Sequence, residues 1–367
     1  MTSYAPQLLN AFLLTVVLVA TLRAAAVPLG LVDRPDERKR HVGQVPLVGG
    51  LAMFPAFVVA SLSLAPDLRV PWNAFAGFAA FVAIGAADDR FSLRAAPRLL
   101  MQFGAAALAV APAGVLVERL GGVSDAGLVL GAFALPFTLV FVVGLANAFN
   151  MADGLDGLAG GVAAGALFWL AITAMALERT AAAIPLLPLL FSVLGFLVFN
   201  LRHRWRARAS VFMGDAGSLL LGAGVAYFVA TFASGEGRVA PFAALLWTCA
   251  LPIVETLSLI VRRIVARRSP MAADRRHLHH ILVDGGVPAA RATALIVGVS
   301  LILGAVGFIG AVAQIDDAAL LAGLAAVGVA HSLFVAYAPS RLPAWLVRPA
   351  RGDAALPSRT PANQQGA

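Results

Sequence analysis

The sequence predicts an all-α membrane protein that crosses the bilayer many times. Hydrophobic residues make up 60% of its 367 positions and charged residues 13%, whereas a soluble globular domain carries about 25% charged residues. Long apolar runs recur along the chain, and a helix needs about 20 such residues to cross the hydrocarbon core. Because lipid cannot satisfy backbone polar groups, we expect these runs to be helical.

About eleven apolar runs are expected spans, although the third and a few others are short for a full crossing. They cover residues 8–27, 47–65, 73–87, 99–117, 128–148, 158–177, 181–201, 216–233, 241–261, 292–312 and 319–338. An odd number of crossings puts the termini on opposite sides. We expect one membrane domain over residues 1–338, and a disordered tail rich in Pro and Arg over residues 339–367.

Basic residues set the expected orientation, because cytoplasmic loops carry the excess of Lys and Arg. With the N-terminus outside, the outer loops hold Arg69, Arg119, Arg179 and Arg238. All other Lys and Arg residues then lie on the cytoplasmic side or, like Arg23, at the inner end of the first span. The net charge of +8 therefore reflects topology, with a cytoplasmic C-terminus, and does not indicate a nucleic-acid partner.

The only lysine and the only cysteine of the chain exclude several kinds of protein and site. Lys39 is the only lysine and lies in no Walker A loop, which excludes a P-loop ATPase. Cys249 is the only cysteine, which excludes an intramolecular disulfide and a Cys-based metal site. Residues 8–26 also resemble a signal peptide, but cleavage there would leave the basic segment 34–40 outside.

Polar residues gather in five expected cytoplasmic loops. A charged Asp at the centre of a membrane helix costs roughly 2.5–3.5 kcal/mol on insertion scales. One Asp at the start of a helix is an ordinary cap, but several acids on one face of the membrane, two of them adjacent, favour a bound divalent cation. These acids, at or near the ends of the spans, are Asp88, Asp89, Asp153, Asp156 and Asp215.

The donor atoms indicate which cation is expected. Asp and Asn oxygens without Cys favour Mg²⁺, with Mn²⁺ as the alternative, over zinc. Residues 262–276 supply six arginines, most of which we assign to topology and lipid headgroups and a minority to a diphosphate. For His277, His279 and His280 we expect hydrogen bonds to phosphate or to a base edge, and a zinc site stays open.

Five motifs occur in order from Asp33 through His280. They are Asp33-x-Pro35 with Arg38-Lys39-x-His41, Asp88-Asp89, Asn147-Ala-Phe-Asn150-x-x-Asp153-Gly-x-Asp156-Gly, Phe212-Met-Gly-Asp215-x-Gly-Ser218 and His277-Leu-His279-His280. With them the chain resembles the polyprenyl-phosphate N-acetylhexosamine-1-phosphate transferases, whose superfamily also contains phospho-N-acetylmuramoyl-pentapeptide transferase. The resemblance implies transfer of a sugar 1-phosphate from a UDP-sugar to a polyprenyl phosphate, with release of UMP, at the cytoplasmic face of a bacterial inner membrane.

The same resemblance implies a role for each matching residue. Asp88, Asp89, Asp153 and Asp156 match catalytic or substrate-binding acids, and Asp88 matches the residue that deprotonates or orients the lipid phosphate. The implied metal ligands are Asn150 and Asp215. The implied substrate-binding residues are His41, Asn147, Phe212, which stacks on uracil, Arg275, Arg276, His277, His279 and His280.

The histidine motif narrows the implied substrates. It matches the N-acetylglucosamine branch, because the muramoyl-pentapeptide branch has three consecutive histidines and Leu278 interrupts that run here. UDP-N-acetylglucosamine and undecaprenyl phosphate are therefore the expected substrates, with another UDP-N-acetylhexosamine left open. One departure is Glu255, where relatives often carry Asp. Its longer side chain leaves the role of this position open.

Three further alternatives stay open. The expected chemistry is direct in-line attack by the lipid phosphate, and a two-step route through an aspartyl intermediate is the alternative. A transporter is a rival from another class, but transporters hold such acids near the bilayer midplane rather than at one interface. A homodimer is also open.

Overall fold

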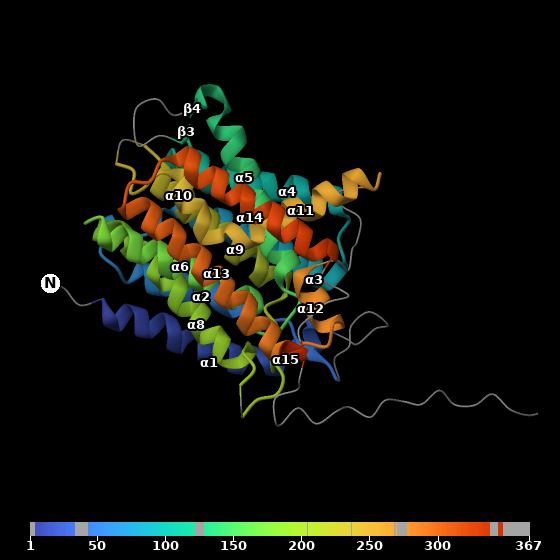
Figure 1. Cartoon of the computed structure of the whole chain (residues 1–367). Helices are drawn as coiled ribbons and strands as arrows, with labels where there is room; N and C mark the ends of the chain where they lie inside the picture. Colours follow the sequence, from blue (N-terminus) through green and yellow to red (C-terminus); the bar gives the residue numbers. More distant parts are fainter. Residues whose placement is uncertain are drawn as a thin grey trace, which may run out of the picture.

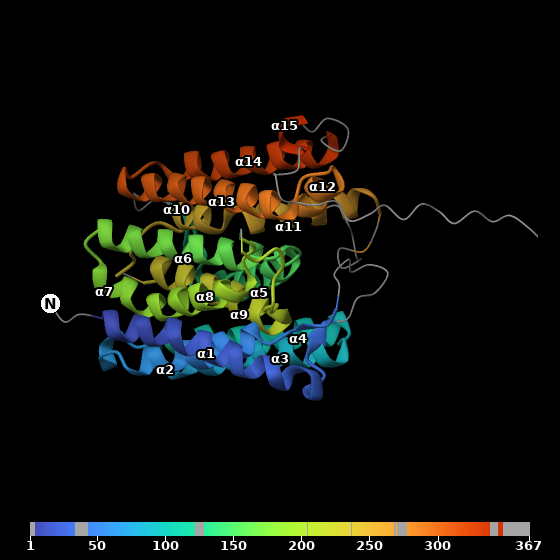
Figure 2. The same cartoon turned by 90° about the horizontal axis from the view of Figure 1, so that it is seen from below.

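The computed structural model is a bundle of helices that run side by side between two ends (Figure 1 and Figure 2). The structure describes residues 4–33, 43–121, 128–203, 205–235, 237–267, 269, 277–337 and 344–347. Within these residues, eight helices are long and apolar enough to cross a membrane. The predicted all-α, multi-pass fold is confirmed.

Some of the eight candidate spans are single helices. Others combine two helical segments that a short 3-10 turn joins. Ile184–Leu186 links α7 to α8, and Trp247–Cys249 links α10 to α11. The helices are α1 (Ala5–Leu29), α5 (Ala134–Ala152), α6 (Leu158–Ala176), α7 (Thr180–Ala183) with α8 (Leu187–Asn200), α9 (Gly214–Ala233), α10 (Phe242–Leu246) with α11 (Ala250–Val265), α13 (Ala289–Val312) and α14 (Asp317–Tyr337).

The other three expected spans form helices that fall short of these criteria. They are α2 (Gly49–Leu62), α3 (Trp72–Phe91) and α4 (Ala95–Val110). The 14 residues of α2 measure only about 21 Å at 1.5 Å per residue. α3 has 20 residues, but Asp88, Asp89 and Arg90 occupy its last turns.

Helix α9 forms the centre of the bundle. In its apolar segment 89% of the residues are buried, compared with 17% in α1 and in α14. It lies against α5 and α3, and the approach to α5 is close enough that a Cβ on Gly222 would come within 2.6 Å of the Cα of Ala146. Gly50 of α2 and Gly85 of α3 likewise leave room for the backbone of the first turn of α9. The position of that turn is therefore fixed by α2 and α3.

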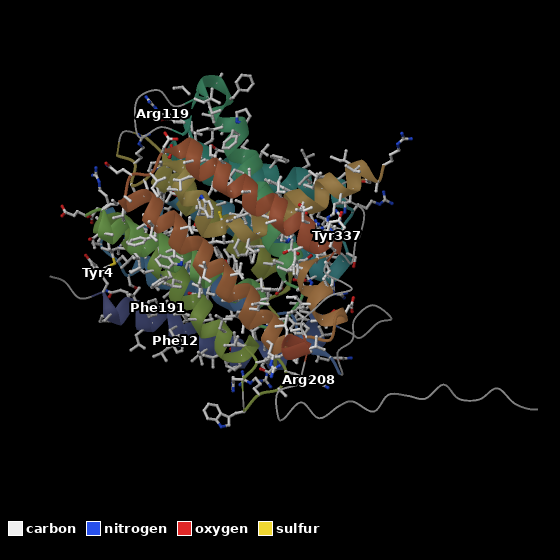
Figure 3. The ribbon with its side chains drawn as sticks, in the orientation of Figure 1. Tyr4, Phe12, Arg119, Phe191, Arg208 and Tyr337 are labelled. Carbon is white, nitrogen blue, oxygen red and sulfur yellow. The ribbon has the colours of Figure 1, made fainter. Side chains whose placement is uncertain are left out.

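Short elements complete the two ends of the bundle. Strands β1 (Val32–Asp33) and β2 (Val45–Pro46) pair antiparallel, as do β3 (Arg119–Leu120) and β4 (Leu128–Val129). The short helices are α12 (Leu278–Asp284) and α15 (Ala344–Val347). Tyr4 and Arg119 lie toward one end, and Tyr337 and Arg208 toward the other (Figure 3).

At three places a helix extends into a polar motif that was expected in a loop. Asn147 and Asn150 belong to α5, which runs to Ala152 rather than ending at residue 148. The Gly-Asp-x-Gly motif forms the first turn of α9. Asp88 and Asp89 are part of α3 rather than the start of a loop. In each case the polar side chains find partners on neighbouring helices, so the helix does not have to end.

Candidate active site

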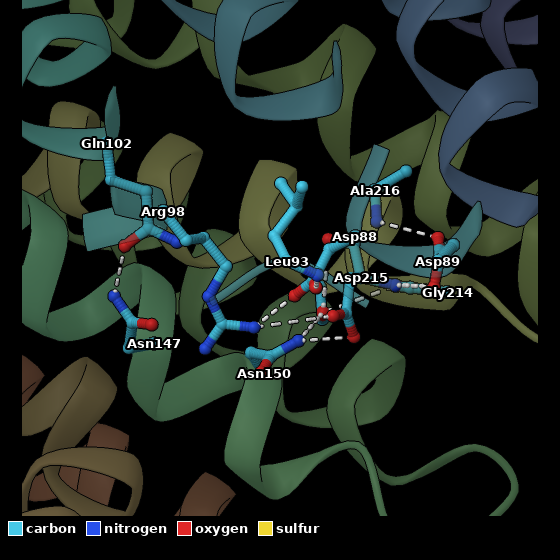
Figure 4. Close-up of polar contacts among 11 residues, drawn as sticks. Asp88, Asp89, Leu93, Arg98, Gln102, Asn147, Asn150, Gly214, Asp215 and Ala216 are labelled. Atoms are coloured by element: carbon cyan, nitrogen blue, oxygen red, sulfur yellow. Dashed lines mark hydrogen bonds and ion pairs between the residues drawn. The ribbon is translucent and has the colours of Figure 1, made fainter. Parts of the chain in front are cut away.

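Asp88, Arg98 and Asp215 form the centre of the polar cluster, where α3, α4 and α9 meet (Figure 4). The side chain of Asp88 is 7% exposed, and its Oδ2 pairs with Nη1 of Arg98. The same Nη1 lies 3.7 Å from Oδ2 of Asp215. Oδ1 of Asp88 accepts a hydrogen bond from the backbone N–H of Leu93 at 2.8 Å. One guanidinium group therefore faces two carboxylates from different helices.

Asp89 binds the backbone of α9. Its Oδ1 accepts from the N–H of Asp215 at 2.9 Å and its Oδ2 from the N–H of Ala216 at 3.3 Å. These N–H groups belong to the first turn of α9, which has no intrahelical acceptor for them, so Asp89 caps the helix from a neighbouring helix. Gly214 has φ +69°, and a Cβ there would overlap the Asp89 carboxylate. In this arrangement Asp89 positions Asp215.

The two asparagines of α5 join neighbouring helices to the site. Nδ2 of Asn150 donates to Oδ1 of Asp215 at 2.7 Å and to Oγ of Ser218 at 3.0 Å, which leaves its carbonyl oxygen for another partner. Nδ2 of Asn147 donates to Oε1 of Gln102 on α4 at 2.6 Å. Asn150 thus contacts Asp215 directly, while Asn147 fixes α4 against α5.

Asp156 holds a neighbouring segment in place. Its Oδ2 accepts from Nε of Arg202 at 2.7 Å and from the N–H of Ala209 at 2.8 Å. Both partners belong to the segment that leads to Phe212 and α9. The carboxylate is therefore engaged with the protein itself.

Asp153 lies between α5 and α6 and near three other acids. Burial is the main cause that raises the pKa of Asp153 from 3.8 to about 8, and the negative charges of Asp215, Asp89 and Asp156 add to it. A buried carboxyl group surrounded by like charge favours its proton or a cation. The charge state of Asp153 should therefore respond to a cation that binds nearby.

The three histidines of the predicted motif lie together around the start of α12. The rings of His277 and His279 stack with centroids 5.4 Å apart, and His280 lies 4.3 Å from His279. Burial is the main cause that lowers the pKa of His279 from 6.5 to about 3; the negative charge of Glu255 opposes this shift, and the charges of His280 and His277 add to it. His279 is 2% exposed and its ring lies against Gly154, so it is a neutral side chain packed beside the Asp153 loop.

Phe212 connects two of the predicted loops through its backbone. Its N–H donates to the carbonyl oxygen of Pro46 at 2.9 Å, and its carbonyl oxygen accepts from the N–H of Gly49 at 3.1 Å. The segment before α2 and the segment before α9 therefore meet beside the site. His41, Arg275 and Arg276 lie outside the described residues.

Three residues that contact the predicted site residues were not predicted from the sequence. They are Arg98, Gln102 and Arg202. Each bonds a predicted site residue, namely Asp88, Asn147 and Asp156. For Arg98 a signal existed, because it follows Asp88 by only ten positions and an arginine near paired carboxylates neutralises them. Gln102, in contrast, lies in an apolar run, and only the packing of α4 on α5 reveals its partner.

The donor atoms of the cluster fit a hard divalent cation. The carboxyl groups of Asp88 and Asp215 both lie beside Nη1 of Arg98, and the side chain of Asp215 is 33% exposed. Within the described residues, no group of three or more His, Cys, Asp or Glu side chains is arranged to hold a metal ion. Mg²⁺ needs no such group, because it takes one or two protein carboxylates and completes its octahedron with water and phosphate.

Comparison with known proteins matches residues 72–233 to glycosyl transferase family 4. The chain is 32% identical to the undecaprenyl-phosphate α-N-acetylglucosaminyl 1-phosphate transferase of Yersinia pestis over 309 residues, 83% of each chain. It is 32% identical to the enzyme with that name from Haemophilus influenzae over 340 residues, 92% of this chain and 93% of the relative. It is 33% identical to the Escherichia coli enzyme over 313 residues, 82% of each chain.

Proposed function

We propose the following reaction for this chain. It belongs to glycosyl transferase family 4, together with the undecaprenyl-phosphate α-N-acetylglucosaminyl 1-phosphate transferases. The chain transfers N-acetylglucosamine 1-phosphate from UDP-N-acetylglucosamine to undecaprenyl phosphate and releases UMP. The observation that carries the proposal is the meeting of Asp88, Arg98 and Asp215 at one end of the bundle, where a diphosphate can be bound.

The chemistry requires positioning and charge neutralisation more than a protein nucleophile. A phosphate oxygen of the lipid attacks the phosphorus that carries the sugar. The bond from that phosphorus to the bridging oxygen breaks, and UMP leaves with that oxygen. In this proposal Asp88 orients the lipid phosphate or takes its remaining proton, and Arg98, held between Asp88 and Asp215, faces the diphosphate.

Mg²⁺, or Mn²⁺ in its place, belongs to the proposal as the cofactor. Asp215 and the carbonyl oxygen of Asn150 would hold the cation, with Asp88 beside them, because these are hard oxygen donors next to each other. When bound, the cation neutralises charge on the diphosphate and the leaving UMP. Asp89 serves it indirectly, since its bond to the N–H of Asp215 fixes the first turn of α9.

The stereochemical course at phosphorus distinguishes direct attack from the two-step route. With a donor that carries a chiral phosphate, direct transfer inverts the configuration. Transfer through an aspartyl intermediate inverts it twice and gives net retention. We expect inversion, because Asp88 is bonded to Arg98 and to the N–H of Leu93, which lowers its nucleophilicity.

The full topology is also a proposal. It comprises eleven crossings, counting α2, α3 and α4 as spans, with the N-terminus outside, the C-terminus in the cytoplasm and the site at the cytoplasmic face of the inner membrane. The distribution of arginines along the sequence supports it. One domain over residues 1–338 and a homodimer belong to the same proposal, and the mass of the detergent-solubilised protein measures the latter.

The test is UMP formation by the purified protein. We expect UMP from UDP-N-acetylglucosamine with undecaprenyl phosphate, and loss of turnover in Asp215→Asn while the variant still folds. Turnover with another UDP-N-acetylhexosamine in preference would assign the donor differently. Absence of UMP with every donor, from a folded protein supplied with Mg²⁺, would overturn the proposed reaction.

A further inference from the structure

Glu255 is a buried acid that the proposed chemistry does not use. It lies on α11, is 8% exposed, and reaches the start of α12. Its Oε1 accepts a hydrogen bond from the backbone N–H of Leu278 at 2.9 Å and lies 3.3 Å from Nδ1 of His277. One carboxylate oxygen therefore contacts both the backbone and the first histidine of the His277–His280 motif.

This contact replaces a missing helix cap. His277 is the residue before the first turn of α12, with extended backbone (φ −84°, ψ 148°), and within the described chain its side chain makes no capping hydrogen bond. The first N–H groups of a helix have no intrahelical acceptor. Glu255 supplies one from a different helix, across 23 positions of sequence.

On its other side α12 packs against the loop that carries Asp153. A Cβ on Gly154 would overlap the Nε2 atom of His279, and the stacked rings of His277 and His279 lie at an interplanar angle of 18°. The histidine segment is thus held between Glu255 and the Gly154 backbone. Loss of either support allows the segment to move relative to Asp153.

The length of the Glu255 side chain determines whether the contact can form. Aspartate at this position would withdraw the carboxylate by about 1.5 Å, one C–C bond. The 2.9 Å bond to Leu278 would then lengthen to about 4 Å, beyond hydrogen-bonding distance. Glutamine keeps the reach and an acceptor oxygen but removes the charge.

We propose that Glu255 is a positioning residue whose reach, rather than its charge, holds the histidine segment against the Asp153 loop for donor binding. The inference rests on the proposed function for its kinetic part. It gives the longer side chain at this position a geometric role in this chain.

The kinetic test compares Glu255→Asp with Glu255→Gln. We expect Glu255→Asp to raise the KM for UDP-N-acetylglucosamine up to about ten-fold, the loss of one hydrogen bond, with kcat changed less than about two-fold. We expect Glu255→Gln to stay within about two-fold of wild type in both constants, because one acceptor oxygen suffices for the Leu278 bond. Wild-type kinetics in Glu255→Asp, or equal damage in both variants, would overturn the inference.

Ser258→Ala is the matched control. It removes the 2.8 Å hydrogen bond between Ser258 and Ser332, one helical turn along α11 from Glu255, without touching α12. We expect wild-type KM from it. If Ser258→Ala raised the KM as Glu255→Asp does, Glu255 would merely stabilise α11, and the inference would be wrong.

Hydrogen exchange of the segment 277–285 provides a readout that does not depend on turnover. Exchange there should be faster in Glu255→Asp than in wild type, and unchanged in Glu255→Gln and Ser258→Ala. Leu278→Pro removes the hydrogen bond to Glu255 from the donor side, because proline lacks the backbone N–H yet fits the first turn of a helix. Leu278→Ala is its control, because it removes the leucine side chain but keeps the N–H. Equal exchange in Leu278→Pro and Leu278→Ala would refute the inference, even if the enzyme used a different donor.

Discussion

Removal of the Arg98 side chain should destabilise the metal-free protein by a calculable amount. Arg98 pairs with Asp88 and lies 3.7 Å from Asp215. Unit charges about 4 Å apart attract by about 4 kcal/mol at an effective dielectric constant of about 20. Breaking a buried pair costs about 3–5 kcal/mol. Because the Arg98 side chain is 25% exposed, we discount this to about 2–3 kcal/mol for Arg98→Ala.

The assay is thermal unfolding in detergent, first with a chelator and then with Mg²⁺. A loss of about 2–3 kcal/mol should lower the unfolding midpoint by about 5 °C in chelator. Mg²⁺ should stabilise Arg98→Ala more than wild type, because a cation takes over the neutralisation of Asp88 and Asp215. Arg94→Ala is the matched control, since it removes the same charge from an exposed position one helical turn earlier. Equal midpoints for the two variants in chelator would refute the reasoning.

Three further predictions concern the surroundings of Asp215. The folded-state pKa of Asp153 is raised from 3.8 to about 8, so the folded protein holds the carboxyl proton of Asp153 more tightly than the unfolded chain does. The stability of the metal-free protein should therefore fall as pH rises from about 4 to about 8. Melting curves across this range should show a smaller fall in Asp153→Asn, and an equal fall would contradict the assignment. Gly154→Ala should lower turnover at least about ten-fold because its Cβ overlaps His279, whereas Gly144→Ala, with open space around it, should turn over like wild type. Asp89→Ala should cost about 1–2 kcal/mol as a lost cap and reduce kcat through Asp215; unchanged values of both would show that the cap does not position the site.

The fold class was predictable because lipid imposes a simple rule on the sequence. The apolar runs marked most helices to within a few residues, as for α1 at Ala5–Leu29 against the expected 8–27. Where a helix extends beyond its apolar run, the polar residues in the extension have partners on other helices. Asn150 lies in the last turn of α5, where its side chain donates a hydrogen bond to Asp215, and no local pattern contains that information.

The sequence predicted some of the residues that make up the site, but it did not predict the structural role of each residue. Asp88, Asn150 and Asp215 come from three different expected loops, and in the structure their side chains lie close together. The sequence could not show that Asp89 caps α9 and that Asp156 binds Arg202, because an acid that binds a cation and an acid that binds an N–H group look alike in sequence. For Glu255, the longer side chain was visible, but the bond to Leu278 depends on the packing of α12.

The most direct measurement of the central claim is Mn²⁺ binding followed by electron paramagnetic resonance, which needs no turnover. The claim is that Asp215, held by Asp89 and Asn150, is the principal protein ligand of a divalent cation. We predict that the wild-type chain binds Mn²⁺, that Mg²⁺ displaces it, and that Asp215→Asn weakens the binding at least about ten-fold while Asp156→Asn leaves it unchanged. Equal affinity in wild type and Asp215→Asn would contradict the account.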